Sequence, residues 1–348
     1  MFNPLKSGHD KAKLILIFIL AAAAFILWKS SCAYAFNAER EYGGIVQMRL
    51  GARSLDAALI SDMLEKRDIE AKDMKYLAWS QKGNVTVENY SLGRSAAFDE
   101  TLCYYGDNHG FFSMVLDNGC ALSAEASFKI FGANAGVIGE TVIIGGENYI
   151  VEKLLYDNFT SVIYKVSEDN IQAEFDVLDI IPGEGDAVSV NEISMNYRVS
   201  GDIVIYYGEV IKFFSAIGTL LLWIAFITAA VFISGSAAKG LNTYIRRAVV
   251  WGGILLTAIC CFAAFGSPVW IPDSFIPTRW SEFEFWSNTF TNYTGILKYY
   301  FSMKTYAPDV LFRSYIIKTL IFAALSAVCV IFAAAVAGKL VKKADVIP

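Results

Sequence analysis

Four long apolar blocks, which hold no charged residue except Lys29 in the first, constrain this chain more than any other feature. A helix needs about 20 apolar residues to cross a hydrocarbon core of about 30 Å at a rise of roughly 1.5 Å per residue. Residues 14–36, 213–233, 248–265 and 319–337 meet this requirement. Hydrophobic residues make up 55% of the chain, more than an ordinary soluble domain contains. We therefore predict a membrane protein with four transmembrane helices.

Basic residues in the short flanks of these blocks predict the orientation, because cytoplasmic flanks retain lysine and arginine. The tail 1–13, the link 234–247 and the tail 338–348 together hold nine basic and two acidic residues. We expect all three to be cytoplasmic, which leaves 37–211 and 266–318 outside. The rest of the chain then holds twenty basic and thirty-two acidic residues. An acidic exterior argues against nucleic acid as a partner, whereas the spans require membrane lipid.

The first apolar block has two interpretations. A basic N-terminal region followed by Ala33-Tyr34-Ala35 also describes a secretory signal with a cleavage site. We take the block as a retained anchor. Either interpretation places the following domain outside the cytoplasm.

The segment 37–211 is predicted to be one α+β domain, because helical stretches alternate there with short β-branched runs bounded by Gly and Asn. We expect an amphipathic helix over 54–66, begun by Ser54, and a hairpin around the turn 145–148. The expected strands are 83–87, 139–144 and 149–155. About 175 residues can bury a core without a metal or a dense disulfide framework.

Two cysteines lie well inside this predicted outer domain, Cys103 and Cys120. In an oxidising exterior they can form a disulfide across a loop. Two buried free thiols are the alternative. The sequence does not decide between them.

The chain lacks the common catalytic and cofactor motifs. It has no P-loop to bind nucleotide phosphates and no G-x-S-x-G nucleophile elbow. It has only two histidines, His9 and His109, and no C-x-x-C pair. We therefore expect no enzymatic activity, no cofactor and no metal in this chain.

The most specific pattern lies between Leu116 and Leu155. Asn118-Gly119 is followed by a helix that ends at Phe131-Gly132, a link Val137–Val142, the glycine turn Gly145-Gly146 and a strand Tyr149–Glu152. This order resembles the extracytoplasmic domain of MacB-type ABC transporter permeases, the group that includes FtsX-like proteins. Gly132 can end the helix in a left-handed conformation, and Gly145-Gly146 can supply positive φ in the turn. A generic helix-to-hairpin unit is the alternative.

The resemblance extends to the layout, because one span, a large outer domain and three further spans is the family's order. It implies a permease-like subunit that works with a separate ABC ATPase subunit and a second permease subunit, as a homo- or heterodimer. Its action would be export or mechanotransmission to a peptide, lipoprotein or envelope protein. A non-transporting receptor or envelope assembly protein is the alternative function, and an unrelated membrane enzyme is a third.

Several positions depart from the family pattern. Glu140 stands where the family usually has Lys, and Glu152 replaces a small or apolar residue. The link 234–247 lacks the family's Arg-x-x-Glu-Ile-Gly pattern, and 266–318 replaces a short turn. The resemblance therefore gives no family motif for the docking of an ATPase on this link.

The link 234–247 is nevertheless the segment where an ATPase would act, because it joins two spans on the cytoplasmic side. Two apolar side chains three residues apart would anchor it and cations would line the rim. Retention by the positive-inside rule alone is the competing explanation of the cations. The candidate coupling residues are Lys239, Leu241, Tyr244, Arg246 and Arg247.

The loop 266–318 is crowded with aromatic residues, several of them at helical spacing. Such a face would lie in the membrane interface or bind a substrate or partner. Its candidate residues are Trp280, Phe283, Trp286, Phe290 and Tyr293.

Overall fold

The structure is a computed structural model of the chain. It describes residues 8–344 except 52–53, 71–72, 111, 113–118, 156–159, 168, 171, 184–189, 200, 240, 266–283, 286, 288–290, 292–293, 295–297 and 299–304. The chain divides into two compact units. A helical unit comprises 1–38, 209–302 and 314–348, and a sheet unit comprises 39–208 and 303–313.

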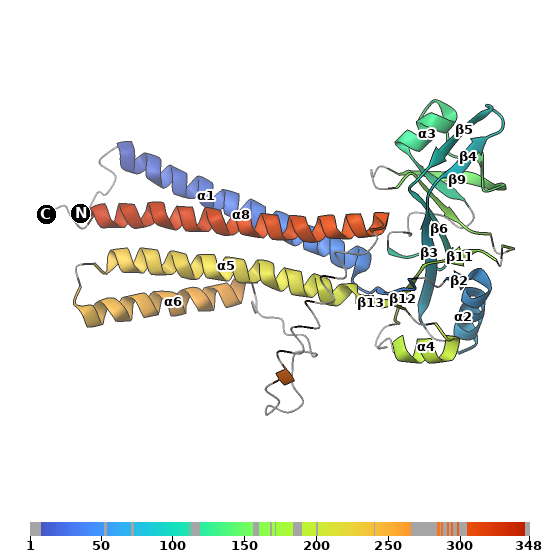
Figure 1. Cartoon of the computed structure of the whole chain (residues 1–348). Coiled ribbons are helices and arrows are strands. Elements are labelled where there is room, and N and C mark those ends of the chain that lie inside the picture. Colours follow the sequence, from blue (N-terminus) through green and yellow to red (C-terminus); the bar gives the residue numbers. More distant parts are fainter. Residues whose placement is uncertain are drawn as a thin grey trace. The chain divides into compact units, whose positions relative to one another are not determined.

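Four helices among the described residues are long and apolar enough to cross a membrane (Figure 1). They are α1 (Gly8–Tyr42), α5 (Tyr207–Ala237), α6 (Thr243–Phe265) and α8 (Ala307–Ala344). Each of the four predicted apolar blocks lies within one of these helices. The sheet unit follows α1 and precedes α5, so a mixed α+β domain lies between the first and second of them, as the sequence predicts.

The start of α8 differs from the prediction. Residues 307–318 were assigned to the aromatic loop, whereas the structure has them as the first turns of α8. Asp309, Arg313 and Lys318 make this stretch too charged for a hydropathy window. Asp309 nevertheless favours the helix, because an acidic side chain in the first turn complements the positive end of the helix dipole.

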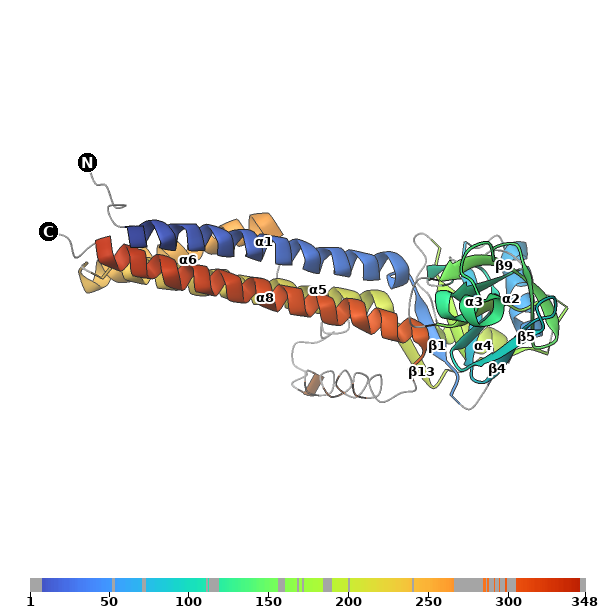
Figure 2. The same ribbon diagram turned by 90° about the horizontal axis from the view of Figure 1, so that it is seen from above.

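Within the helical unit, α1 and α8 run side by side (Figure 2) and are joined by two hydrogen bonds through small side chains. The Ser31 hydroxyl donates to the Thr319 carbonyl, and the Ser326 hydroxyl donates to the Ala24 carbonyl, each at 2.8 Å. Between apolar helices, such small polar residues allow close approach and form interhelical bonds. Leu222 and Ala225 of α5 pack against Ala327 of α8 in the same unit.

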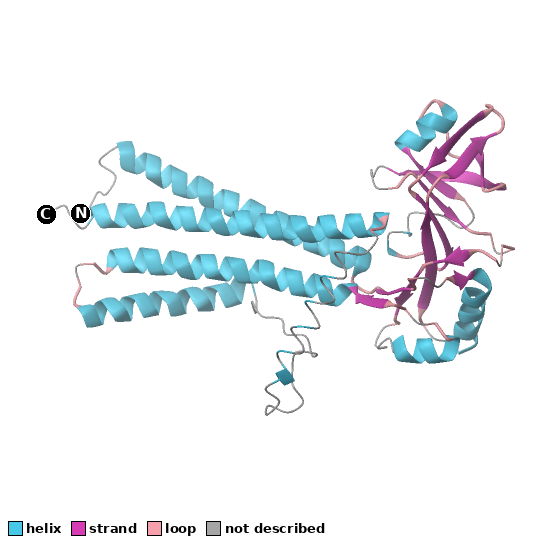
Figure 3. Ribbon diagram, viewed as in Figure 1, coloured by secondary structure: helices cyan, strands magenta, loops and turns pink. Residues whose placement is uncertain are grey.

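The sheet unit contains an eleven-stranded sheet in the order β13-β1-β12-β3-β6-β10-β7-β9-β8-β4-β5. Figure 3 draws its strands in magenta. Most neighbours are antiparallel, while β10 with β6 and β7 with β9 are parallel. A separate two-stranded sheet pairs β2 with β11. The strands are β1 (Val46–Arg49), β2 (Leu55–Asp56), β3 (Lys75–Lys82), β4 (Val85–Asn89), β5 (Arg94–Phe98), β6 (Thr101–Gly106), β7 (Cys120–Ser123), β8 (Thr141–Ile144), β9 (Glu147–Leu155), β10 (Val162–Lys165), β11 (Glu174–Phe175), β12 (Val177–Ile181) and β13 (Ile203–Tyr206).

Three short helices complete the sheet unit: α2 (Ala57–Glu70), α3 (Ala124–Phe131) and α4 (Val190–Tyr197). One face of the central strands packs with residues of α2 and α4, through Ile60, Met63 and Ile193. The opposite face carries Leu77 and Trp79 and packs with Tyr306 and Ala307. A third cluster lies between α3 and strands β4, β5, β7, β8 and β9.

Both glycine predictions in the family-like stretch are confirmed, whereas the cap at Ser123 was not predicted. Ser123 caps α3 by accepting from the Ala126 amide, and Gly132 ends it in the left-handed conformation at φ 77°. Gly145 and Gly146 both have positive φ, at 60° and 92°. Because Ile144 pairs with Glu147, the hairpin turn is these two glycines alone, tighter than expected.

Helix α2 begins later than predicted. The sequence places its start at Ser54, whereas the structure pairs Leu55 and Asp56 with β11 and starts the helix at Ala57. The Asp56 carboxylate accepts from the Leu59 amide, so Asp56 performs the capping expected of Ser54.

Candidate functional site

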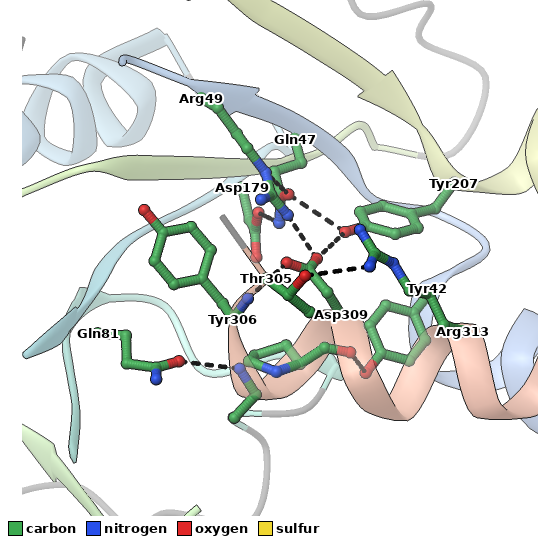
Figure 4. Close-up of polar contacts among 12 residues, drawn as sticks. Tyr42, Gln47, Arg49, Gln81, Asp179, Tyr207, Thr305, Tyr306, Asp309 and Arg313 are labelled. Carbon is green, nitrogen blue, oxygen red and sulfur yellow. Dashed lines mark hydrogen bonds and ion pairs between the residues drawn. The ribbon is translucent and has the colours of Figure 1, made fainter. Parts of the chain in front are cut away.

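The sheet unit buries a cluster of polar and charged side chains on one face of strand β1. Side chains alternate across a strand, so Gln47 and Arg49 share a face while Met48 points into the core with α2 and α4. Asp179 on β12 lies directly opposite Gln47 in the ladder and therefore joins the same face. We call these three residues, with Asp309 of α8 and Tyr207 of α5, the polar cluster (Figure 4).

Asp309 is the centre of the polar cluster, although it lies 260 residues from Arg49 in the chain. The Arg49 guanidinium forms an ion pair with its carboxylate, and the side chains are 7% and 0% exposed. The Tyr207 hydroxyl lies 3.2 Å from the same carboxylate and 3.1 Å from the Gln47 amide oxygen. The hydroxyl has one proton, so it donates to one of these acceptors at a time.

Gln47 links the two carboxylates of the polar cluster. Its amide oxygen accepts from Arg49 Nε at 2.8 Å, and its amide nitrogen donates to Asp179 Oδ1 at 2.8 Å. The indole N–H of Trp79 donates to the other oxygen of Asp179 at 2.9 Å. These partners fix which way the Gln47 amide points.

Asp179 has a shifted acidity. Burial raises its pKa to about 7, although the hydrogen bonds from Gln47 and Trp79 and the charge of Arg49 act in the opposite direction. The negative charge of Asp309 adds to the increase. Removing a carboxylate from water disfavours its charged form, and here the two hydrogen bonds both come from neutral donors.

The first turn of α8 is held on the sheet by further bonds, several of them drawn in Figure 4. The Asp309 carboxylate accepts from the Tyr306 amide at 2.9 Å and so caps its own helix. The side chain of Gln81 accepts from the Ala307 amide at 2.9 Å. The Tyr42 hydroxyl donates to the Pro308 carbonyl at 2.9 Å.

Aromatic rings pack around these bonds. Tyr42 at the end of α1, Tyr207 at the start of α5 and Phe312 of α8 lie with ring centroids 4.6–5.3 Å apart. On the sheet, Trp79 contacts Tyr306 at 5.2 Å, and Tyr306 lies 5.1 Å from the Arg49 guanidinium. Edge-to-face aromatic pairs contribute roughly 0.5–1.5 kcal/mol each beyond their burial.

The ends of three helices contribute buried aromatic side chains beside the polar cluster. Tyr42, Tyr207 and Phe312 are at most 3% exposed. One end of each of three apolar helices is thereby built into the core of the sheet unit. Among the described residues, no group of three His, Cys, Asp or Glu side chains is placed to hold a metal ion.

The predicted coupling residues of the link lie elsewhere and are exposed. Asn242 caps α6, because its carbonyl accepts from the Arg246 amide and its side chain lies 3.4 Å from the Tyr244 amide. Tyr244 is 80% exposed in the first turn of α6, and Leu241 is 45% exposed just before it. The three cations Lys239, Arg246 and Arg247 are exposed as well.

The other candidate residues have different outcomes. The aromatic residues Trp280, Phe283, Trp286, Phe290 and Tyr293 lie outside the described residues. Cys103 and Cys120 are both free and buried, which is the second of the two alternatives. Both pair with Tyr164 of β10, which lies between their strands. The Cα atoms of the two cysteines are therefore two strand spacings of about 4.8 Å apart. A disulfide spans at most roughly 7 Å between Cα atoms, so these two cysteines cannot form one.

Sequence reasoning missed the polar cluster. Gln47 and Arg49 look like ordinary polar positions after the first span, and Asp309 looks like a charge in an outer loop. The only available signal was Pro308-Asp309 before an apolar block, since Pro and an acidic residue favour the first turn of a helix. It predicts a helix start but gives no partner for Asp309.

Comparison with known proteins gives few matches. No protein-family model matches the chain, and no curated protein matches it. Solved structures do match, among them the extracellular domain of the noncanonic ABC-type transporter YknZ from Gram-positive bacteria. The two chains are 13% identical, and the match covers 46% of this chain and 99% of that one with a TM-score of 0.29.

Proposed function

We propose that this chain is a permease-like membrane subunit of a MacB-type ABC system. A separate ATPase would move the four apolar helices, and the helices would move the sheet unit outside the cytoplasm. The observation that carries the proposal is the attachment of three helix ends to the core of the sheet unit, through Tyr42, Tyr207 and the first turn of α8. In the proposed mechanism, these helix ends are the points at which movement of the helices would reach the sheet unit.

The attachment suits transmission of force better than simple anchoring. A tether needs one flexible connection, whereas here α1, α5 and α8 each end or begin in buried contacts of the sheet unit. The sequence resemblance over 116–155 and the order of spans support the same function.

The link before α6 is the proposed contact for the ATPase. Leu241 and Tyr244 are exposed apolar side chains, and the neighbouring cations line the same turn. A groove on the ATPase would accept the two apolar side chains as its anchor. This interpretation places the link in the cytoplasm and the sheet unit outside.

The experiment is purification of the full chain from its own cells, with co-purifying ABC ATPases identified by mass spectrometry and their rate of ATP hydrolysis measured. We expect the double variant Leu241→Ala, Tyr244→Ala to lose co-purification or stimulated hydrolysis while its membrane insertion stays normal. Tyr90→Ala is the matched control, because Tyr90 is 88% exposed in the sheet unit and should change neither readout. Unaltered binding and hydrolysis in the double variant would refute the coupling role.

Topology is tested separately. Single cysteines at Ser91 and Asn242, both exposed, are treated with a membrane-impermeant thiol reagent on intact cells. The cysteine at position 91 should react and the one at position 242 should not. Labelling at position 242 would overturn the orientation. If the orientation holds and no ATPase binds, the receptor or assembly function is favoured instead.

A further inference from the structure

We propose that the polar cluster is a proton-operated latch, in which a proton on Asp179 holds the first turn of α8 on the sheet and loss of that proton releases it. The inference goes beyond the proposed function and holds whether or not an ATPase binds the chain. It rests on the composition of the polar cluster, on what covers it and on how its members are bonded.

The charges of the polar cluster do not balance when both of its carboxylates are ionised. The polar cluster contains two carboxylates, Asp179 and Asp309, and one guanidinium, Arg49, all at most 5% exposed. Arg49 forms its ion pair with Asp309. If Asp179 is ionised as well, the buried cluster carries one uncompensated negative charge. Buried charges without a partner are costly, and a carboxyl group avoids the cost by binding a proton.

The groups that surround Asp179 show which member of the polar cluster titrates near neutral pH. The charged and titratable groups around it include Arg49 on β1, Asp309 on α8, Tyr207 on α5 and Tyr306 just before α8, with Asp176 beside Tyr306. The ordinary pKa of tyrosine is about 10, and burial raises the pKa of Tyr306 above it. Asp179 is therefore the group of the polar cluster placed to titrate, and its pKa of about 7 agrees.

The start of α8 lies over Asp179. Tyr306 and Ala307 pack on this face of the sheet with Leu77, Trp79 and other apolar side chains. Releasing the first turn of α8 would admit water to Asp179 and would remove the ion pair of Arg49. Hydration returns the pKa of a carboxyl group toward its ordinary value of about 3.9. The latched state therefore binds a proton that the released state does not.

Linkage gives the sign and the size of the effect. Between about pH 4 and pH 7 the latched state holds one more proton than the released state, so each rise of one pH unit favours release by up to tenfold. Below about pH 4 both states are protonated, and above about pH 7 both are ionised. The latch is thus tightest in acid and reaches a constant, weaker level above neutral pH.

Amide hydrogen exchange of the full chain in detergent micelles measures the latch. Peptides that cover residues 305–313 report opening, because the amides of Tyr306 and Ala307 are bonded to Asp309 and Gln81. Exchange rates are divided by the intrinsic rate at each pH. We expect protection to fall by up to about a hundredfold from pH 5 to pH 7 and then to level off.

Two variants identify the titrating group. Asp179→Asn cannot titrate, so its protection should be independent of pH, whereas Glu88→Gln, an exposed site on β4, should behave like the parent. Asp309→Asn removes a negative charge that raises the pKa of Asp179, so its response should move to lower pH.

The outcomes are decisive in each case. A parent protein with constant protection between pH 5 and pH 7 overturns the proposal, and so does an Asp179→Asn variant that keeps the parent's response. If Asp179→Asn does not fold, Asp309→Asn decides the matter. An unchanged midpoint in that variant would show that the titrating group lies outside the polar cluster.

Discussion

Removing Arg49 should destabilise the sheet unit more than neutralising its partner Asp309. Arg49→Met leaves two buried carboxylates, Asp179 and Asp309, and removes the ion-pair partner of the second. Breaking a buried ion pair from one side costs about 3–5 kcal/mol. Asp309→Asn instead leaves Arg49 with Asp179, which can lose its proton and balance the charge. That variant should cost only about 1.5–3 kcal/mol, the value of a hydrogen bond to a charged group.

Thermal unfolding of the full chain in detergent, followed by intrinsic fluorescence at pH 7, measures the difference. For a domain of this size about 2–4 °C of Tm corresponds to 1 kcal/mol. Arg49→Met should therefore lower the Tm by roughly 6–20 °C and Asp309→Asn by roughly 3–12 °C. The double variant Arg49→Met, Asp309→Leu should recover much of the loss, since it leaves no unpaired charge. If Asp309→Asn costs as much as Arg49→Met, or more, Asp179 does not compensate and the charge argument fails.

Three further predictions concern other parts of the chain. Gly132→Ala should destabilise the sheet unit by about 1–2 kcal/mol, because Gly132 has φ 77°. Gly235→Ala is the control, since Gly235 lies within α5 with free space for a methyl group, and it should be neutral or stabilising. Thermal unfolding measures both. Cys103 and Cys120 should resist alkylation at pH 8 until the protein unfolds, because both are buried and burial raises the pKa of the Cys120 thiol to about 12. A disulfide between them, found by mass spectrometry, would contradict the structure. Ser326→Ala should weaken the pairing of α1 with α8 by about 0.6 kcal/mol in detergent unfolding, and an effect near zero would mean that its hydrogen bond adds nothing.

The features that the sequence predicted well are those encoded locally. Apolar blocks, the glycine pair before β9 and the cap at Gly132 each depend on a few neighbouring residues, and the structure has all of them. Helix α2 was displaced only at its start, because Asp56 rather than Ser54 provides the cap.

The features that it missed depend on distant pairing. The ion pair of Arg49 with Asp309 joins the two ends of the chain, and no local pattern links them. The cysteine pair failed for a related reason. Cys103 and Cys120 are near in sequence, but β10 comes later in the chain and inserts between their strands. Charge near a span also hid the first turns of α8, since hydropathy cannot distinguish an outer loop from a helix end that is buried in a domain.

The dependence of the sheet unit on residues 303–313 has a consequence for how the protein is made. Strand β1 emerges from the ribosome early, whereas the segment that covers Trp79 and neutralises Arg49 is translated more than 200 residues later. At about 5–20 residues per second the nascent sheet would wait on the order of tens of seconds with this face uncovered. A chain cut short before α8 would leave the face of Trp79 uncovered and Arg49 without the Asp309 carboxylate, and an exposed apolar face marks a protein for quality control. The sheet unit begins to fold first, but it is complete only after α8 has been made.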